Sequence, residues 1–132
     1  MKARKPKEPN PVRDEWKCSY GDHCFEPGCK ASIRRGDVLE CHECVGGSDR
    51  HKTVRMPEFW LALCQTHHEP LGSRPNQESL VRQLAVKLFA DPLHYNATAV
   101  VKMWRPNCTA DFVLEIISAV QVEHARLIRE YR

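Results

Sequence analysis

Apolar residues are spaced in two ways along the chain, and the spacing changes near residue 72. Between residues 16 and 72 the apolar runs are short and are broken by Gly and Pro, which predicts small hairpins. ASIRRGDVLECHECVGGSD, residues 31–49, predicts two short strands around an Arg35-Gly36-Asp37 turn, with a loop at Gly46-Gly47. FWLALC, residues 59–64, predicts the returning strand. The following QTHHEP predicts a short helix that Pro70 and Gly72 end.

Helical spacing begins at residue 76. NQESLVRQLAVKLFADP, residues 76–92, predicts a helix that Asn76 or Ser79 caps and Pro92 ends. Its apolar stripe is Leu80, Val81, Leu84 and Leu88. Residues 93–104 predict a second short helix, and the segment after Thr109 predicts an amphipathic helix of about six turns. We expect the last helix to pack on the core, with a homodimer through it as the alternative.

Composition describes one modest domain with a basic start. The chain has 132 residues, 42% hydrophobic and 28% charged, enough for one core and an appended element. No apolar run approaches a membrane span and no signal-peptide core is visible, so we expect a cytoplasmic protein without membrane contact. MKARKPKEPNPVR holds five basic residues, one acid and three prolines. Residues 1–15 therefore predict a flexible arm for a polyanion, or an ordinary solubilising tail.

Seven cysteines and seven histidines, several at short spacing, favour metal ligands over disulfides. A zinc knuckle needs ligand pairs with two to four residues between them, and three pairs meet this spacing: Cys24/Cys29, Cys41/Cys44 and Cys64/His67. Cys64/His67 falls at the predicted strand-to-helix junction, but its partner pair is open. With Cys41/Cys44 the protein is a non-catalytic zinc-stabilised DNA-binding or adaptor module. With Cys24/Cys29 the strand is free to present a histidine. A zinc hydrolase of small molecules is poorly supported, because no His-Glu-x-x-His motif is present.

A longer pattern runs through LECHECVGGSDRHK and FWLALCQTHH. The matching residues are Leu39, Glu40, His42, Glu43, Gly46, Gly47, Arg50, Trp60, Leu63, Cys64, His67 and His68. In these positions the chain resembles the HNH endonuclease family, most closely its phage-type members, over roughly residues 24–90. It departs from the family in the wider Cys24/Cys29 gap, in lacking the middle Asn near Phe59, and in lacking a third His after His68.

The resemblance implies an α+β fold: a small ββα-metal domain over residues 16–90 and a helical C-terminal extension over residues 91–132. It implies a metal-dependent endonuclease that cleaves DNA in a bacterial or phage-infected cell. Structural Zn²⁺ would be held by Cys24, Cys29, Cys64 and His67.

His42 would be the general base, because a neutral imidazole accepts a proton near physiological pH. His68 would bind the catalytic Mg²⁺ or another divalent cation. Glu43 would ligate this metal or orient His42; in the strict family register His42 becomes the ligand and Glu43 the base. Strand alternation makes Glu40 a competing ligand. Three basic residues would grip phosphates: Arg50, Lys52 and Arg55.

Overall fold

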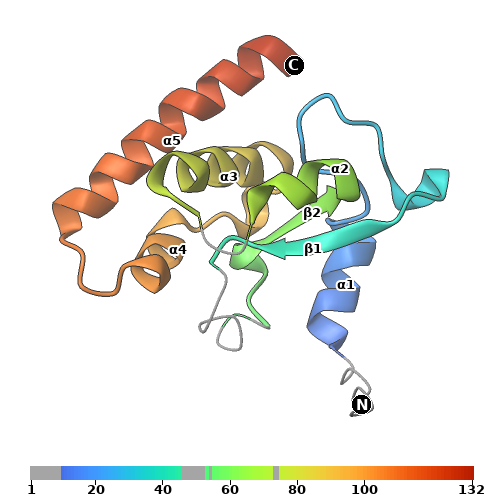
Figure 1. The fold of residues 1–132 in the computed structure, drawn as a ribbon, viewed down its shortest axis with the longest axis horizontal. Coiled ribbons are helices and arrows are strands. Elements are labelled where there is room, and N and C mark those ends of the chain that lie inside the picture. Colours follow the sequence, from blue (N-terminus) through green and yellow to red (C-terminus); the bar gives the residue numbers. More distant parts are fainter. Residues whose placement is uncertain (1–9, 46–52, 54, 73–74) are drawn as a thin grey trace.

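The computed structural model describes residues 10–45, 53, 55–72 and 75–132, and over these residues the fold is mixed α+β. This part of the chain forms a two-stranded antiparallel hairpin and five α-helices, and Figure 1 shows how they are arranged. The elements are α1 (Pro11–Ser19), β1 (Leu39–Glu43), β2 (Trp60–Cys64), α2 (Gln65–His68), α3 (Gln77–Ala90), α4 (Ala97–Trp104) and α5 (Ala110–Tyr131). None of the helices described here is long and apolar enough to cross a membrane.

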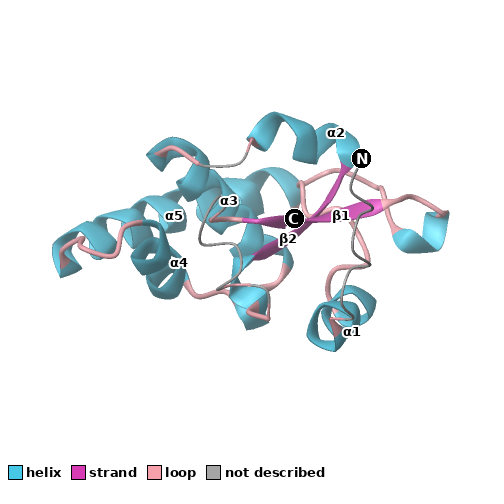
Figure 2. Ribbon diagram, turned by 60° about the horizontal axis from the view of Figure 1, so that its bottom comes forward, coloured by secondary structure: helices cyan, strands magenta, loops and turns pink. Residues whose placement is uncertain are grey.

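The β1–β2 hairpin is the centre of the fold. Leu39 pairs with Cys64 and His42 pairs with Leu61, so the start of β1 lies beside the end of β2. Residues 60–63 of β2 are all buried, as expected for a strand covered on both faces. Figures 1 and 2 show α1 on one side of the hairpin and α2 on the other.

The C-terminal helices form where the apolar spacing predicted them, and each begins at a side-chain cap. Asn76 accepts a hydrogen bond from the Ser79 amide at 2.8 Å, and Thr109 accepts one from the Phe112 amide at 3.1 Å. The buried side of α5 consists of Val113, Ile116, Val120 and Leu127. These side chains belong to the same hydrophobic cluster as the hairpin residues, and α5 packs mainly on α3.

A buried lysine ties α3 to the hairpin. The Lys87 ammonium donates hydrogen bonds to the backbone carbonyls of Pro57 and Trp60, both at 2.8 Å, and to Asp91 at 2.9 Å. The Trp16 indole of α1 donates to the same Asp91 carboxylate at 2.9 Å. Burial lowers the pKa of Lys87, while Asp91 opposes this shift. Burial alone would raise the pKa of Asp91, but the bonds from Trp16 and Lys87 hold it below its ordinary value.

Two segments differ from the sequence expectation. Residues 11–15, expected in the flexible arm, form the first turns of α1, because Pro11 suits a first helical turn and Asn10 caps the Arg13 amide at 3.1 Å. Residues 1–9 lie outside the described residues. Of the two strands expected in residues 31–49, the first is a 3-10 turn instead, Ile33–Arg35, preceded by a single bridge between His23 and Ser32. Ser32 and Asp37 form side-chain bonds to the local backbone, which favour a turn over a strand.

Candidate metal centre and histidine site

Three cysteines and one histidine meet where β2 runs into α2. Cys64 ends β2, His67 lies in α2, and Cys24 and Cys29 come from the segment before β1. The sulfur of Cys24 lies 3.6 Å from His67 Nδ1, and the sulfur of Cys64 lies 3.2 Å from the same nitrogen. The Cys29 and Cys64 sulfurs are 4.0 Å apart, and one ligand atom from each residue lies within 4.8 Å of all the others.

These separations fit a tetrahedral metal ion. Ligands about 2.3 Å from a central zinc lie roughly 3.8 Å from one another, close to the separations seen here. Three sulfurs and one imidazole nitrogen are also a ligand set that structural zinc prefers. The predicted cluster is therefore confirmed as a group that can bind a metal ion such as zinc.

The cluster joins segments distant in sequence. The Cys64 amide donates to the Cys24 sulfur at 3.4 Å, which links the end of β2 to the segment before β1. Burial raises the pKa of the Cys24 thiol to about 12, with smaller opposing contributions from backbone hydrogen bonds. Its thiolate therefore needs a cation beside it at neutral pH, and a metal ion would supply that charge.

The alternative knuckle, Cys41 and Cys44, lies elsewhere. Both belong to the described residues, yet neither is part of a metal-ligand cluster there. Cys44 is completely buried in the core, and burial raises its pKa to about 12. Burial likewise raises the pKa of Cys41 to about 11. Cys44 therefore behaves as a small buried thiol and Cys41 as a partly buried one.

Two predicted site histidines lie together on the α2 side of the hairpin. The ring of His42 on β1 and the ring of His68 on α2 meet edge to face, with centroids 5.0 Å apart. The Glu40 carboxylate, two residues before His42 on the same strand face, contacts His68 Nδ1. Carboxylates in this position orient metal-binding histidines and leave the other ring nitrogen free for the ion.

His42 is held from behind by α3. Its Nε2 lies 2.9 Å from the side-chain oxygen of Gln83, and the Gln83 amide nitrogen donates to the Ser79 hydroxyl at 3.0 Å. Burial lowers the pKa of His42 to about 4; the Gln83 bond opposes this and the nearby His68 adds to it. The His42 ring is therefore neutral at physiological pH, with one nitrogen available for a proton or a cation.

This histidine site is more open than the cysteine cluster. Among the described residues, Glu40, His42 and His68 do not form a closed group of three converging ligand atoms. His68 and Glu40 also keep part of their side chains exposed. A divalent cation held here would complete its coordination with water or substrate oxygens, as Mg²⁺ commonly does.

Glu43 lies on the opposite face of β1, which corrects its expected role beside His42. Its carboxylate pairs with the Arg13 guanidinium at 2.8 Å and accepts a hydrogen bond from the Thr53 hydroxyl at 3.1 Å. Neighbouring residues on a strand point to opposite faces, so Glu43 cannot share a ligand position with His42. It links β1 to α1 instead.

The predicted phosphate contacts are only partly described. Arg50 and Lys52 lie outside the described residues. Arg55 is exposed in the segment leading into β2.

Sequence reasoning missed Gln83. Leu80, Gln83, Leu84 and Lys87 follow the i, i+3, i+4, i+7 spacing of one buried helical stripe, and all four are buried. Gln83 and Lys87 are polar residues within this buried stripe, so each needs a buried hydrogen-bond partner. This requirement is the sequence signal that could have identified Gln83.

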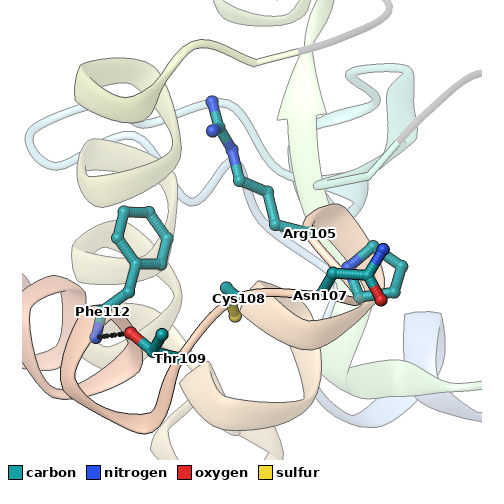
Figure 3. Close-up of a pocket in the computed structure, with 6 residues that line it drawn as sticks. Arg105, Asn107, Cys108, Thr109 and Phe112 are labelled. Atoms are coloured by element: carbon teal, nitrogen blue, oxygen red, sulfur yellow. Dashed lines mark hydrogen bonds between the residues drawn. The ribbon is translucent and has the colours of Figure 1, made fainter.

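A separate hollow of about 510 Å³ lies at the turn between α4 and α5. Figure 3 shows Arg105, Asn107 and Phe112 around it, with the Thr109 hydroxyl bonded to the Phe112 amide as the α5 cap. None of the predicted site residues lines it.

No protein-family model, curated protein or solved structure matches the chain.

Proposed function

We propose that this protein is a metal-dependent endonuclease of the HNH type, which hydrolyses phosphodiester bonds in DNA. The observation that carries the proposal is the edge contact between His42 and His68, at 5.0 Å, with Glu40 against His68. Two histidines from different elements, one neutral and one carboxylate-backed, are the groups that base-assisted and metal-assisted hydrolysis requires.

The order of elements supports the same proposal. Two antiparallel strands are followed directly by a short helix, which is the ββα arrangement that the resemblance implies. The metal-ligand cluster lies at the β2–α2 junction, and His67 in this cluster is next to His68 in sequence. A metal ion in the cluster would fix α2 against the end of β2 and the segment before β1, and with it the position of His68.

The residues divide the chemistry between them. His42, neutral at physiological pH, accepts the proton of the attacking water. His68 would hold a divalent cation through its Nε2, because Glu40 contacts the ring at Nδ1. A bound divalent cation, Mg²⁺ or another, would supply positive charge to the scissile phosphate and the leaving oxygen. The reverse assignment, with His42 as the ligand, uses the same two rings.

A plasmid-nicking assay tests the proposal. Zinc-loaded protein is incubated with supercoiled plasmid and titrated with Mg²⁺ or Mn²⁺. We expect nicking that depends on the added ion and that His68→Ala abolishes at low ion concentration. If His68 is a metal ligand, a high ion concentration should partly restore nicking by His68→Ala. Nicking lost through the removal of a general base is not restored in this way. Protein with stoichiometric zinc that binds DNA yet never nicks it contradicts the nuclease and favours a zinc-stabilised binding module.

A further inference from the structure

The segment before β1 projects from the molecule with apolar side chains exposed. Residues 33–38 are all exposed, and they include Ile33 at 49% and Val38 at 81% exposure. Figure 1 shows this segment at the edge of the molecule, beyond the hairpin. Single exposed apolar residues are common, whereas two branched ones within one short projecting turn offer a partner a small apolar contact. We refer to residues 30–38 as the 30–38 turn.

The 30–38 turn is held in one shape by its own hydrogen bonds. The Asp37 carboxylate accepts from the Ser32 amide at 3.0 Å, and the Asp37 amide donates to the Ser32 carbonyl at 3.0 Å. The Arg35 guanidinium donates to the Lys30 carbonyl at 2.9 Å. Gly36 has a φ of 86°, which a side chain would disfavour. A preorganised turn presents its apolar residues with a smaller ordering cost on binding than a flexible one would.

The turn is anchored next to the histidine site. Cys29 of the metal-ligand cluster immediately precedes it, and Leu39, paired with Cys64, immediately follows it. Val38 is two residues before Glu40, so their backbones are separated by roughly 7 Å or less. Whatever the turn contacts is therefore positioned beside Glu40 and His68.

The charges of the turn favour a polyanion. Lys30, Arg34 and Arg35 of the same turn are exposed, whereas the Asp37 carboxylate accepts a hydrogen bond from the Ser32 amide. Duplex-binding surfaces typically combine two features: cations that contact phosphates, and an apolar wedge that contacts the sugars and base edges of a groove. A protein partner would need the apolar residues but not the cations.

We propose that the 30–38 turn inserts into a groove of duplex DNA, with Ile33 and Val38 as the apolar wedge and Arg34 as a phosphate contact. This inference rests on the proposed function, because it takes the substrate to be DNA that is double-stranded next to the scissile phosphate. It adds a duplex-recognition surface separate from the predicted contacts at Arg50, Lys52 and Arg55.

Fluorescence anisotropy tests the proposal. The binding of a short labelled duplex is compared with the binding of one of its single strands, and divalent metal is left out of both measurements. Ile33→Ser/Val38→Ser should weaken duplex binding about tenfold, because it removes apolar contact, and leave its salt dependence unchanged. Single-strand binding should change little, because a single strand has no groove. Arg34→Ala should flatten the logarithmic salt slope by about 0.9. Matched controls are Leu93→Ser/Val122→Ser, which are exposed at 69% and 73%, and Lys102→Ala, exposed on α4.

The outcomes separate this inference from the nuclease proposal. Unchanged duplex affinity in both turn variants overturns the inference even if the wild type nicks plasmid, and it redirects the turn to a protein partner. Equal decreases in the turn and control variants, or wild-type protein that binds no duplex, overturn it as well. Weakened duplex binding in the turn variants alone supports the inference even if no nicking is found, in which case only the nuclease proposal fails.

Discussion

Replacing Lys87 with methionine tests how the hairpin is fixed to α3. The Lys87 and Asp91 side chains are buried, and the lysine ammonium satisfies two backbone carbonyls and one carboxylate. Methionine retains most of the apolar contact but leaves these acceptors without their donor. Asp91 keeps its bonds to Trp16 and His94, so its charge is only partly uncompensated. Breaking a buried pair of this kind costs about 3–5 kcal/mol, a large share of the roughly 5–15 kcal/mol that stabilises a domain.

Thermal unfolding with zinc present measures the effect. For a chain of this length, 3–5 kcal/mol corresponds to a fall in Tm of roughly 10–18 °C. Lys102→Met, an exposed lysine on α4, is the matched control and should change Tm by no more than about 2 °C. Lys87→Met/Asp91→Leu should be less destabilised than the sum of its single changes, since it removes both charges. A Lys87→Met protein within about 1 kcal/mol of wild type would refute the reasoning.

Three further changes test other parts of the account. Cys29→Ser should lose bound metal by elemental analysis and destabilise the hairpin, because it removes a ligand, whereas Cys41→Ser should keep the metal; the opposite pattern would assign the knuckle to Cys41 and Cys44. Residues 1–9 hold four basic residues, and deleting them should flatten the salt dependence of DNA binding. The logarithmic slope should decrease by about 0.9 for each phosphate that is no longer neutralised. An unchanged slope would leave the segment a passive tail. Because burial lowers the pKa of His42 to about 4, the wild-type protein should lose free energy of unfolding as the pH falls from 6.5 towards about 4. His42→Gln has no such group, so its free energy of unfolding should fall less over this range, by up to about 3 kcal/mol. Parallel pH profiles of the two proteins would count against this.

The parts that the sequence predicted are those with local signals. The helices α3 and α5 follow from apolar spacing and from the caps Asn76 and Thr109, and β2 follows from its short apolar run. Ligand spacing indicates the Cys64/His67 pair at the strand-to-helix junction, but it left two partner pairs open, and Cys24 and Cys29 were expected only from the resemblance to the HNH family. Each of these signals lies within a few residues of the feature it predicts.

Of the parts that sequence reasoning missed, one depends on a contact between distant segments and two had local signals. Pro11 and Asn10 indicate a helix start, but the basic and proline-rich composition outweighed them in the prediction of an arm. Gln83 becomes the partner of His42 only because α3 packs behind β1, 41 residues away in sequence. Glu43 is a different case, because strand alternation alone places it opposite His42, and Arg13 of α1 then pairs with it.

The rate of plasmid nicking by His42→Ala, compared with wild type, is the most direct test of the proposed hydrolytic site. Both proteins are assayed with zinc loaded and the same divalent cation added, and His124→Ala on α5 serves as the histidine control. The account predicts unchanged zinc content and DNA affinity, with cleavage reduced roughly 10²- to 10⁴-fold in His42→Ala and unaltered in His124→Ala. Cleavage by His42→Ala at the wild-type rate would contradict the assignment of the reaction to this histidine.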